Sequence, residues 1–299
     1  NRVKNRLCLH CCTFSMFYRR LLVRLESENT MPSNPSEKPH EPLNEIEVTE
    51  PVRDAASVIL VRPNLDGQPG LQAFMLRRSA STTVMNSAYV FPGGKVDAED
   101  AQQNAFKQYR VPDDAAQRIN EPDLDPVLAA ALFVAACREC EEECGVSLTA
   151  DDLIPFSRWI TPKTPAMMRR RFDTRFFLAC LPPDASAIHD GVEADASEWM
   201  SPKDAIEAYC AVRIALAPPQ IMTLAAIARF GTYKELTDSL AGHVPPLIEP
   251  LGIKDANGGR TICYPGDPEH AVRKPAFAGP TRLLWRKDHF EPEAGPQAF

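Results

Sequence analysis

The sequence predicts a mixed α/β (α+β) fold, in which one mixed β-sheet is sandwiched between helices. Two apolar segments, residues 53–61 and 71–78, flank a turn-forming stretch at residues 63–67, so they predict a pair of neighbouring strands. Because strands and helices do not alternate regularly, a doubly wound parallel sheet is not expected. Further strands are predicted at residues 88–91, 156–160, 171–181 and 198–200.

Helices are predicted in three places. Residues 129–144 combine an apolar stripe with a separate acidic face. Ser201 and Pro202 are residue types that cap and open a helix. Residues 218–240 form an additional helical segment towards the C-terminus. Residues 101–125 are polar and contain two prolines, which predicts one short helix followed by a surface loop.

The composition changes near both ends of the chain and predicts three regions. Residues 51–242 form the folded domain, with an insertion at 101–125. Residues 243–299 are rich in proline and glycine and are expected to pack on that domain as a tail. Residues 1–50 are expected to be disordered or a misassigned extension. Their first thirty positions carry a charge of +4, which fits an Arg-rich targeting peptide or a stretch upstream of a start at Met31.

Bulk composition argues against several classes of protein. The 299 residues carry a net charge of −7, which is unfavourable for nonspecific binding to nucleic acid. No apolar run approaches the roughly 18 residues that span a bilayer, so no membrane contact is expected. The nine cysteines form no regular framework, which favours a reducing cytoplasm over a secreted disulfide scaffold.

Residues 138–146 (RECEEECGV) are the most informative segment of the chain. In a helix Glu139, Glu142 and Glu143 lie within an arc of roughly 100°, where their like charges repel. A divalent cation such as Mg²⁺ between them would replace this repulsion with attraction. The alternative is an ordinary solvated acidic face. Gly145 is suited to end the helix.

Three cysteines share this helix. Cys137 and Cys140 form a CxxC pair that could bind a metal, and Cys144 follows one turn later. Their spacing continues the apolar stripe from Phe133, however, so we expect buried thiols that act as small apolar side chains.

Residues 93–95 (GGK) and 138–146 together resemble the Nudix box of Nudix hydrolases, a loop–helix–loop motif with the pattern G-x5-E-x7-R-E-U-x-E-E-x-G-U, where U is a bulky apolar residue. The second half matches at every fixed position, with Cys140 and Val146 as the apolar residues. The resemblance covers about residues 53–267 and implies the Nudix fold. The divided box resembles a subgroup related to the peroxisomal coenzyme A diphosphatases.

The first half of the box departs from the family pattern. The position for glutamate holds Asp100, with Glu99 as an alternative, and 37 residues (101–137) stand where the family has seven. The insertion must therefore loop out between turn and helix. A coenzyme A-specific pattern of other Nudix members is not visible in residues 79–90. An extra acid from outside the box is left open among Glu193, Asp195 and Glu198.

The resemblance implies that water attacks a phosphorus of a nucleoside diphosphate linked to another group, with Mg²⁺ or Mn²⁺ as cofactor. It implies that Glu139, Glu142, Glu143 and the Gly93 carbonyl hold the metal. Glu139 or a metal-bridging partner would take the proton from water, and Arg138 would orient the glutamates.

The resemblance also suggests the substrate and its contacts. Gly93, Gly94 and Lys95 would lie against phosphate, while Arg171 would either grip a phosphate or belong to a solvated basic turn. The preferred substrate is coenzyme A or acyl-CoA, giving 4′-phosphopantetheine or its acyl form and adenosine 3′,5′-bisphosphate. The alternatives are ADP-ribose, NADH, a dinucleoside polyphosphate, or a non-catalytic module that senses a nucleotide. The oligomeric state is left open, with a homodimer as one possibility.

Overall fold

The computed structural model describes residues 46–65, 69–79, 87–165, 170–254 and 259–299. All of them belong to one structural unit, residues 43–299. The predicted N-terminal extension, with Met31, lies outside the described residues except for positions 46–50.

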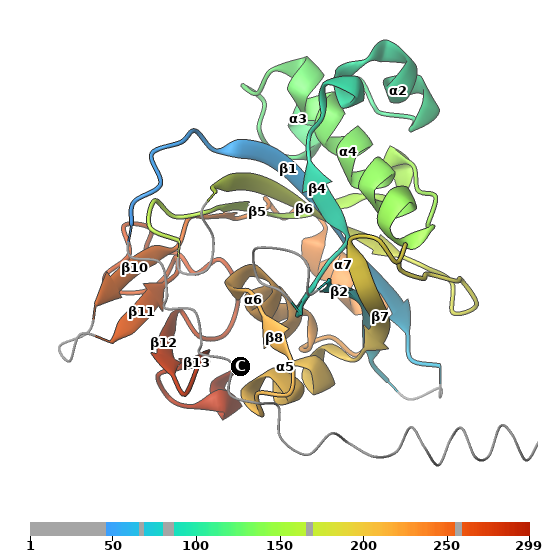
Figure 1. Cartoon of the computed structure of the whole chain (residues 1–299). Helices are drawn as coiled ribbons and strands as arrows, with labels where there is room; N and C mark the ends of the chain where they lie inside the picture. Colours follow the sequence, from blue (N-terminus) through green and yellow to red (C-terminus); the bar gives the residue numbers. More distant parts are fainter. Residues whose placement is uncertain (1–45, 66–68, 80–86, 166–169, 255–258) are drawn as a thin grey trace, which may run out of the picture. The chain divides into compact units, whose positions relative to one another are not determined.

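A nine-stranded mixed sheet forms the body of this unit (Figure 1). Its strands are β1 (Arg53–Pro63), β2 (Leu71–Arg78), β3 (Ala88–Val90), β4 (Gly93–Lys95), β5 (Ile154–Ile160), β6 (Phe172–Cys180), β7 (Ala194–Met200), β8 (Ala215–Leu216) and β9 (Leu247–Ile248). Their order is β8-β3-β2-β1-β6-β5-β9, while β4 pairs with β1 and β7 pairs with β2. The predicted mixed α/β fold is confirmed.

Strand β1 lies at the centre of the sheet. It runs parallel to β6 and antiparallel to β4 in its first half and to β2 at its end. Because both of its edges are paired and both of its faces are covered, residues 55–61 are all buried instead of alternating. The change of partner on one edge places β4 beside the first half of β1, and β4 carries the glycine turn of the site described below.

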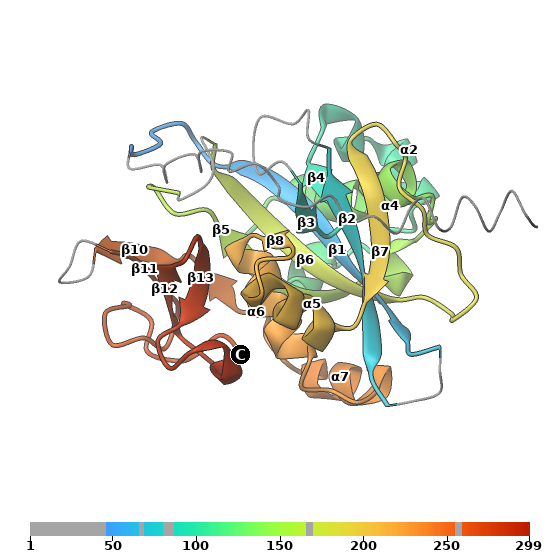
Figure 2. The same cartoon turned by 60° about the horizontal axis from the view of Figure 1, so that its bottom comes forward.

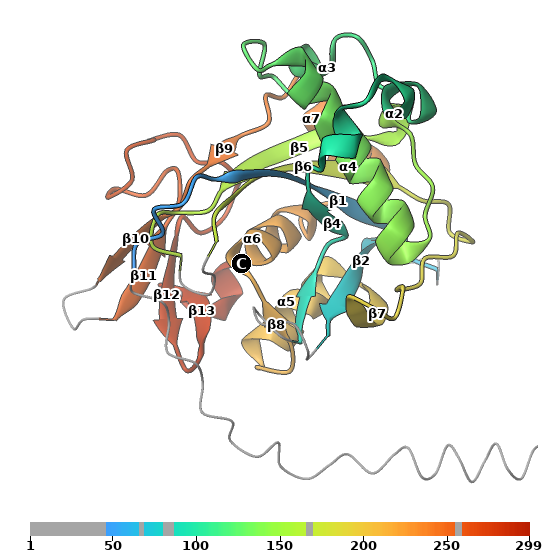
Figure 3. The same cartoon turned by 45° about the horizontal axis from the view of Figure 1, so that its top comes forward.

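Helices cover both faces of the sheet, as Figures 2 and 3 show from two sides. Helix α4 (Pro126–Cys144) packs on one face, and α5 (Pro202–Cys210) and α6 (Pro218–Ile227) pack on the other. On the α4 face the rings of Phe133 and Phe177 are 4.8 Å apart, beside Val58 and Leu60. Burial of each such side chain contributes about 1.5–3 kcal/mol.

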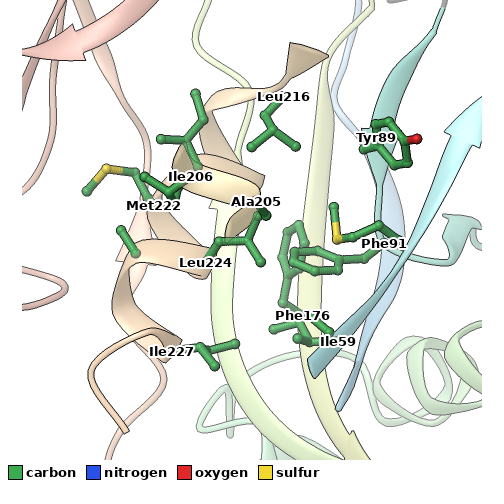
Figure 4. Close-up of a cluster of buried hydrophobic side chains, with 14 of the residues drawn as sticks. Ile59, Tyr89, Phe91, Phe176, Ala205, Ile206, Leu216, Met222, Leu224 and Ile227 are labelled. Carbon is green, nitrogen blue, oxygen red and sulfur yellow. The ribbon is translucent and has the colours of Figure 1, made fainter. Parts of the chain in front are cut away.

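The second core lies between the sheet and α6. Ile59, Phe91 and Phe176 face Leu224 and Ile227 across this layer (Figure 4). Along β1 the even-numbered residues 58 and 60 therefore point to α4 and the odd-numbered residue 59 points to α6, as the period of two in a strand requires.

Two helical predictions need correction. The insertion contains two short helices, α2 (Gln103–Gln108) and α3 (Ala115–Arg118), instead of one. Tyr109 and Ile119 are buried in the α4 core, so the insertion is more than a surface loop. The predicted helical segment at 218–240 contains two helices, α6 and α7 (Tyr233–Leu240), because α6 ends at Ile227 and residues 228–232 are not helical.

The C-terminal segment has regular structure that the sequence analysis did not predict. Beyond β9 it forms an antiparallel four-stranded sheet in the order β10-β11-β12-β13. These strands are β10 (Leu251–Lys254), β11 (Arg260–Cys263), β12 (Arg282–Arg286) and β13 (His289–Pro292). The Tyr209 hydroxyl of α5 donates to the carbonyl of Phe290 at 3.0 Å, which joins this sheet to the helical layer. Within the described residues, no helix is both long and apolar enough to cross a membrane.

Candidate active site

Helix α4 is firmly bounded at both ends. The Asp125 carboxylate accepts from the backbone N–H groups of Val127 (2.9 Å) and Leu128 (3.0 Å), and Pro126 occupies the first helical position. Gly145 ends the helix with a φ of 68°, a conformation in which a side chain is disfavoured. The acidic motif, residues 138–146, therefore covers the last two turns of α4 and the two residues after it.

The three helix cysteines are buried, as predicted. Cys137, Cys140 and Cys144 are at most 1% exposed, and burial raises the pKa of Cys137 to about 12. The sulfurs of Cys140 and Cys144 are 3.6 Å apart as free thiols. These thiols form the apolar back of the helix and leave the glutamates on another face.

The glycine turn lies directly against this glutamate face. The backbone N–H of Gly93 donates to Glu143 Oε2 at 2.7 Å. At Gly93 φ is 151°, and a Cβ atom would lie 2.4 Å from the Ala56 carbonyl oxygen of β1. At Gly94 a Cβ atom would lie 2.2 Å from Glu139 Oε1. Only glycine leaves room for the carboxylate at this position.

Arg138 connects the turn, Asp100 and the helix. Its Nε and Nη2 atoms donate to the two oxygens of Asp100 at 2.8 and 2.9 Å. Its Nη1 donates to Glu139 and Glu142, both at 2.9 Å, and Nη2 donates to the Lys95 carbonyl at 3.2 Å. This fork raises the pKa of Arg138, the Asp100 hydrogen bonds being the largest cause.

Asp100 has a defined position despite being shorter than the family's glutamate. It lies in the short 3-10 helix η1 (Ala98–Ala101) and is 1% exposed. Besides Arg138, it accepts from the backbone N–H of Asp97 at 2.8 Å. The insertion thus begins only after the chain has delivered this carboxylate to Arg138.

Negative charge accumulates around the turn. The pKa of Glu143 is raised to about 8, with burial as the largest cause; the charges of Glu139 and Glu193 add to the rise, whereas the Gly93 N–H and Arg78 oppose it. Burial also raises the pKa of Glu139, against the opposing effect of Arg138. A cation bound here would relieve both desolvation and repulsion.

The three candidate acids outside the box have different surroundings. The charge of Glu193 acts on both Glu139 and Glu143. Asp195 instead accepts from Arg77 at 2.7 Å, and Glu198 acts on Tyr89. Glu193 precedes β7, which pairs with β2, and this non-local pairing places it near the helix.

Lys95 and Arg171 have other partners. Lys95 pairs with Asp97, two residues along the chain. Arg171 donates to the Thr161 carbonyl at 2.9 Å and pairs with Glu249 at 3.2 Å, so its contacts link β6 to the C-terminal segment. A substrate role for either side chain requires that these partners be exchanged.

In the described residues the carboxylates are not arranged as a metal centre. The described residues contain no group of three or more His, Cys, Asp or Glu side chains that could hold a metal ion. Glu142 is turned to Arg138 and Glu143 to the Gly93 N–H, which separates the three predicted ligands. The donor types nevertheless fit a hard divalent cation, and the pKa values of Glu139 and Glu143 are raised mainly by burial, with neighbouring negative charges as a smaller cause.

Comparisons with known proteins show to which proteins the chain is similar. The profile described as NUDT19 Nudix domain matches residues 127–227. The chain is 28% identical to the acyl-coenzyme A diphosphatase NUDT19 of Gallus gallus, over 74% of this chain and 82% of that protein. It is 32% identical to the putative nudix hydrolase 7 of Caenorhabditis elegans, over 74% of this chain and 75% of that protein.

A solved structure shares the fold. The NUDIX hydrolase from Alicyclobacillus acidocaldarius superimposes with a TM-score of 0.50 at 22% identity, over 64% of this chain and 97% of that one. The sequence identity to the nematode relative extends well beyond the glutamate helix. On the similarity to this nematode relative, as the divided box predicts, the chain belongs to the Nudix hydrolase family.

Proposed function

We propose that this chain hydrolyses the diphosphate of coenzyme A or acyl-CoA, releasing 4′-phosphopantetheine or its acyl form and adenosine 3′,5′-bisphosphate. The similarity to an acyl-coenzyme A diphosphatase over most of its length supports the substrate class. The observation that carries the chemistry is the contact of the Gly93–Gly94 turn with Glu139 and Glu143.

A divalent cation, Mg²⁺ or Mn²⁺, would be held by Glu139, Glu143 and the Gly93 carbonyl. Glu142 would join after leaving Arg138, and Glu193 is the acid outside the box. When bound, such an ion neutralises phosphate oxygens and lowers the pKa of a coordinated water.

The residues of the chain supply the proton transfer and the positioning. The water oxygen bonds to one phosphorus as the bridging P–O bond breaks, and the departing phosphate keeps the electron pair. Glu139 or a neighbouring carboxylate accepts the proton of the water. Arg138 holds Glu139 and Asp100 in place, so its role is to position the base. The turn brings backbone, without a side chain, up to the diphosphate.

A substrate panel with Mg²⁺ tests this proposal. Wild-type protein would be incubated with coenzyme A, acyl-CoA, ADP-ribose, NADH and a dinucleoside polyphosphate. We expect the CoA compounds to be cleaved fastest, with both named products. Cleavage of another diphosphate in their place would reject the substrate, and nucleotide binding without cleavage would favour a sensing module.

Two variants on α4 complete the design. Glu143→Gln keeps the shape of the side chain and should strongly slow cleavage. Glu141→Gln is the matched control, because Glu141 accepts from Ser147 at 3.0 Å and is not a fixed position of the box. Full activity of Glu143→Gln would disprove the assignment of the carboxylates.

We also infer a reducing, cytoplasmic location. The six cysteines of the described residues are free thiols, including the adjacent pair on α4. The predicted homodimer stays a prediction that a measurement of mass in solution would test.

A further inference from the structure

Arg78 is a second arginine beside the glutamates, and the sequence analysis did not select it. It is the last residue of β2, where its register partner is Ala194 of β7. The next backbone N–H, that of Ser79, donates to the Glu193 carbonyl at 3.0 Å. Arg78 therefore lies in the strand pair that delivers Glu193 to the site.

The alternation of the strand directs Arg78 towards α4. Phe74 and Leu76 belong to the core under α4, and so does Ala194, the partner of Arg78 beyond a shift in the register of β2 and β7 between Arg77 and Arg78. Arg77 lies on the opposite face and pairs with Asp195 at 2.7 Å. The two adjacent arginines are thus divided between the two sides of the sheet.

The Nε atom of Arg78 is buried and has no hydrogen-bond partner among the described residues. The neighbouring cations are already engaged, since Lys95 pairs with Asp97 and Arg138 binds a group of carboxylates. The positive charge of Arg78 nevertheless acts on Glu143, so it reaches the glutamate face. A buried, unpaired guanidinium N–H beside a catalytic carboxylate is suited to an anionic oxygen.

We propose that Arg78 binds a phosphate oxygen of the substrate diphosphate from the β2 side of the glutamates. This inference rests on the proposed function only in requiring a diphosphate ligand. A planar guanidinium can hold phosphate with two parallel donors, whereas an ammonium acts as a point charge. Arg78 thus takes the phosphate-binding role that the sequence analysis gave to Lys95 and Arg171.

Binding of a ligand that is not turned over tests the inference. The probe is α,β-methylene-ADP, measured by calorimetry on the full chain in the presence of Mn²⁺. We expect Arg78→Gln to weaken binding by roughly tenfold or more, and Arg78→Lys to fall between it and the wild type. Arg77→Gln, the matched control on the other face, should stay within about twofold.

Direct Mn²⁺ binding separates ligand recognition from a purely structural role. Loss of a nearby positive charge should leave Mn²⁺ affinity of Arg78→Gln unchanged or tighter. Equal affinity of wild type and Arg78→Gln for the probe would overturn the proposal. It would also be overturned if Arg78→Gln lost probe binding and Mn²⁺ binding together, or if the wild type did not bind the probe. If Arg78→Gln does not fold, Arg78→Lys carries the comparison. Failure to cleave CoA compounds would reject only the proposed substrate, because this experiment needs no turnover.

Discussion

Two ion-pair clusters lie on the α4 side of the sheet, and they differ in charge balance. In the Arg138 cluster two cations, Arg138 and Lys95, share four carboxylates, those of Asp97, Asp100, Glu139 and Glu142. In the Arg175 cluster two arginines, Arg158 and Arg175, share three carboxylates, those of Asp54, Glu121 and Asp173.

The Arg175 cluster joins the insertion to the sheet. Arg175 is 3% exposed, donates to both oxygens of Glu121 at 2.8 and 2.9 Å, and donates to Asp54 at 2.6 Å. Glu121 lies between α3 and α4, whereas Asp54 begins the central strand. The near balance of charge suits a structural role, because buried charges are tolerated only when they are paired.

The Arg138 cluster keeps a surplus of negative charge, and Glu143 with its raised pKa lies beside it. Such a surplus costs folding energy, so its presence is better explained by a cationic ligand than by stability. The comparison indicates that the balance of charge, more than the number of ion pairs, separates the candidate active site from the structural cluster.

The largest expected effect is the loss of activity in Glu143→Gln. We expect kcat to fall by roughly a hundred- to ten-thousand-fold, because the variant removes a carboxylate from the glutamate face. The unfolding temperature should stay the same or rise, since burial disfavours the ionised form of Glu143 and a neutral amide carries no such penalty. Steady-state kinetics beside thermal unfolding measures both, and a fall in stability together with activity would contradict this contrast.

Arg175→Met should show the opposite pattern. It leaves Asp54 without its arginine and Glu121 and Asp173 with Arg158 alone, and we expect a loss of about 3–5 kcal/mol in the free energy of unfolding. Urea denaturation measures this loss. The control is Arg118→Met, which breaks an exposed pair with Asp114 and should cost at most about 1 kcal/mol. Similar losses in the two variants would mean that the buried Arg175 cluster stabilises the fold no more than an exposed ion pair does.

Asp100→Glu restores the family residue at a position without free space. Because Asp100 is 1% exposed and already binds Arg138 with both oxygens, the added methylene should cost about 1–3 kcal/mol. Activity per folded molecule should not increase. If Asp100→Glu were as stable as the wild type and more active, the site would have room for glutamate, and aspartate would not be the better residue at this position.

The smallest effect concerns an ion pair in the C-terminal segment. Hydrogen bonds from Arg282 lower the pKa of Asp267 from 3.8 to about 2. A lowered folded-state pKa stabilises the fold above pH 3.8, and this contribution is lost as the pH falls towards 2. Asp267→Asn should cost about 1–2 kcal/mol at pH 7 and should converge with the wild type near pH 2. Acid titrations followed by circular dichroism would show parallel curves if the pair contributes nothing.

The sequence predicts the features that depend on local patterns. The strands β1 and β2 and the buried face of α4 follow from apolar spacing within short segments. The strands β10 to β13 were missed because each has only four or five residues between proline- and glycine-containing loops.

The candidate site shows the same division. The contacts of Glu139, Glu143 and Arg138 with the glycine turn agree with the motif, although their roles in catalysis stay a prediction. The choice of Glu193 and the position of Arg78 depend on the pairing of β2 with β7, which brings together residues more than a hundred positions apart. A single sequence carries no signal for such a pairing, whereas the period of two along β2 could have separated Arg78 from Arg77.

The division of the box also has a consequence for folding. The Arg138–Asp100 and Gly93–Glu143 contacts join residues 38 and 50 positions apart, so a long loop must close before either can form. An isolated α4 would carry its glutamates without the turn that faces them. Catalytic competence should therefore appear late in refolding, after β1 and β4 have paired, and ligand affinity would report on the completeness of the fold.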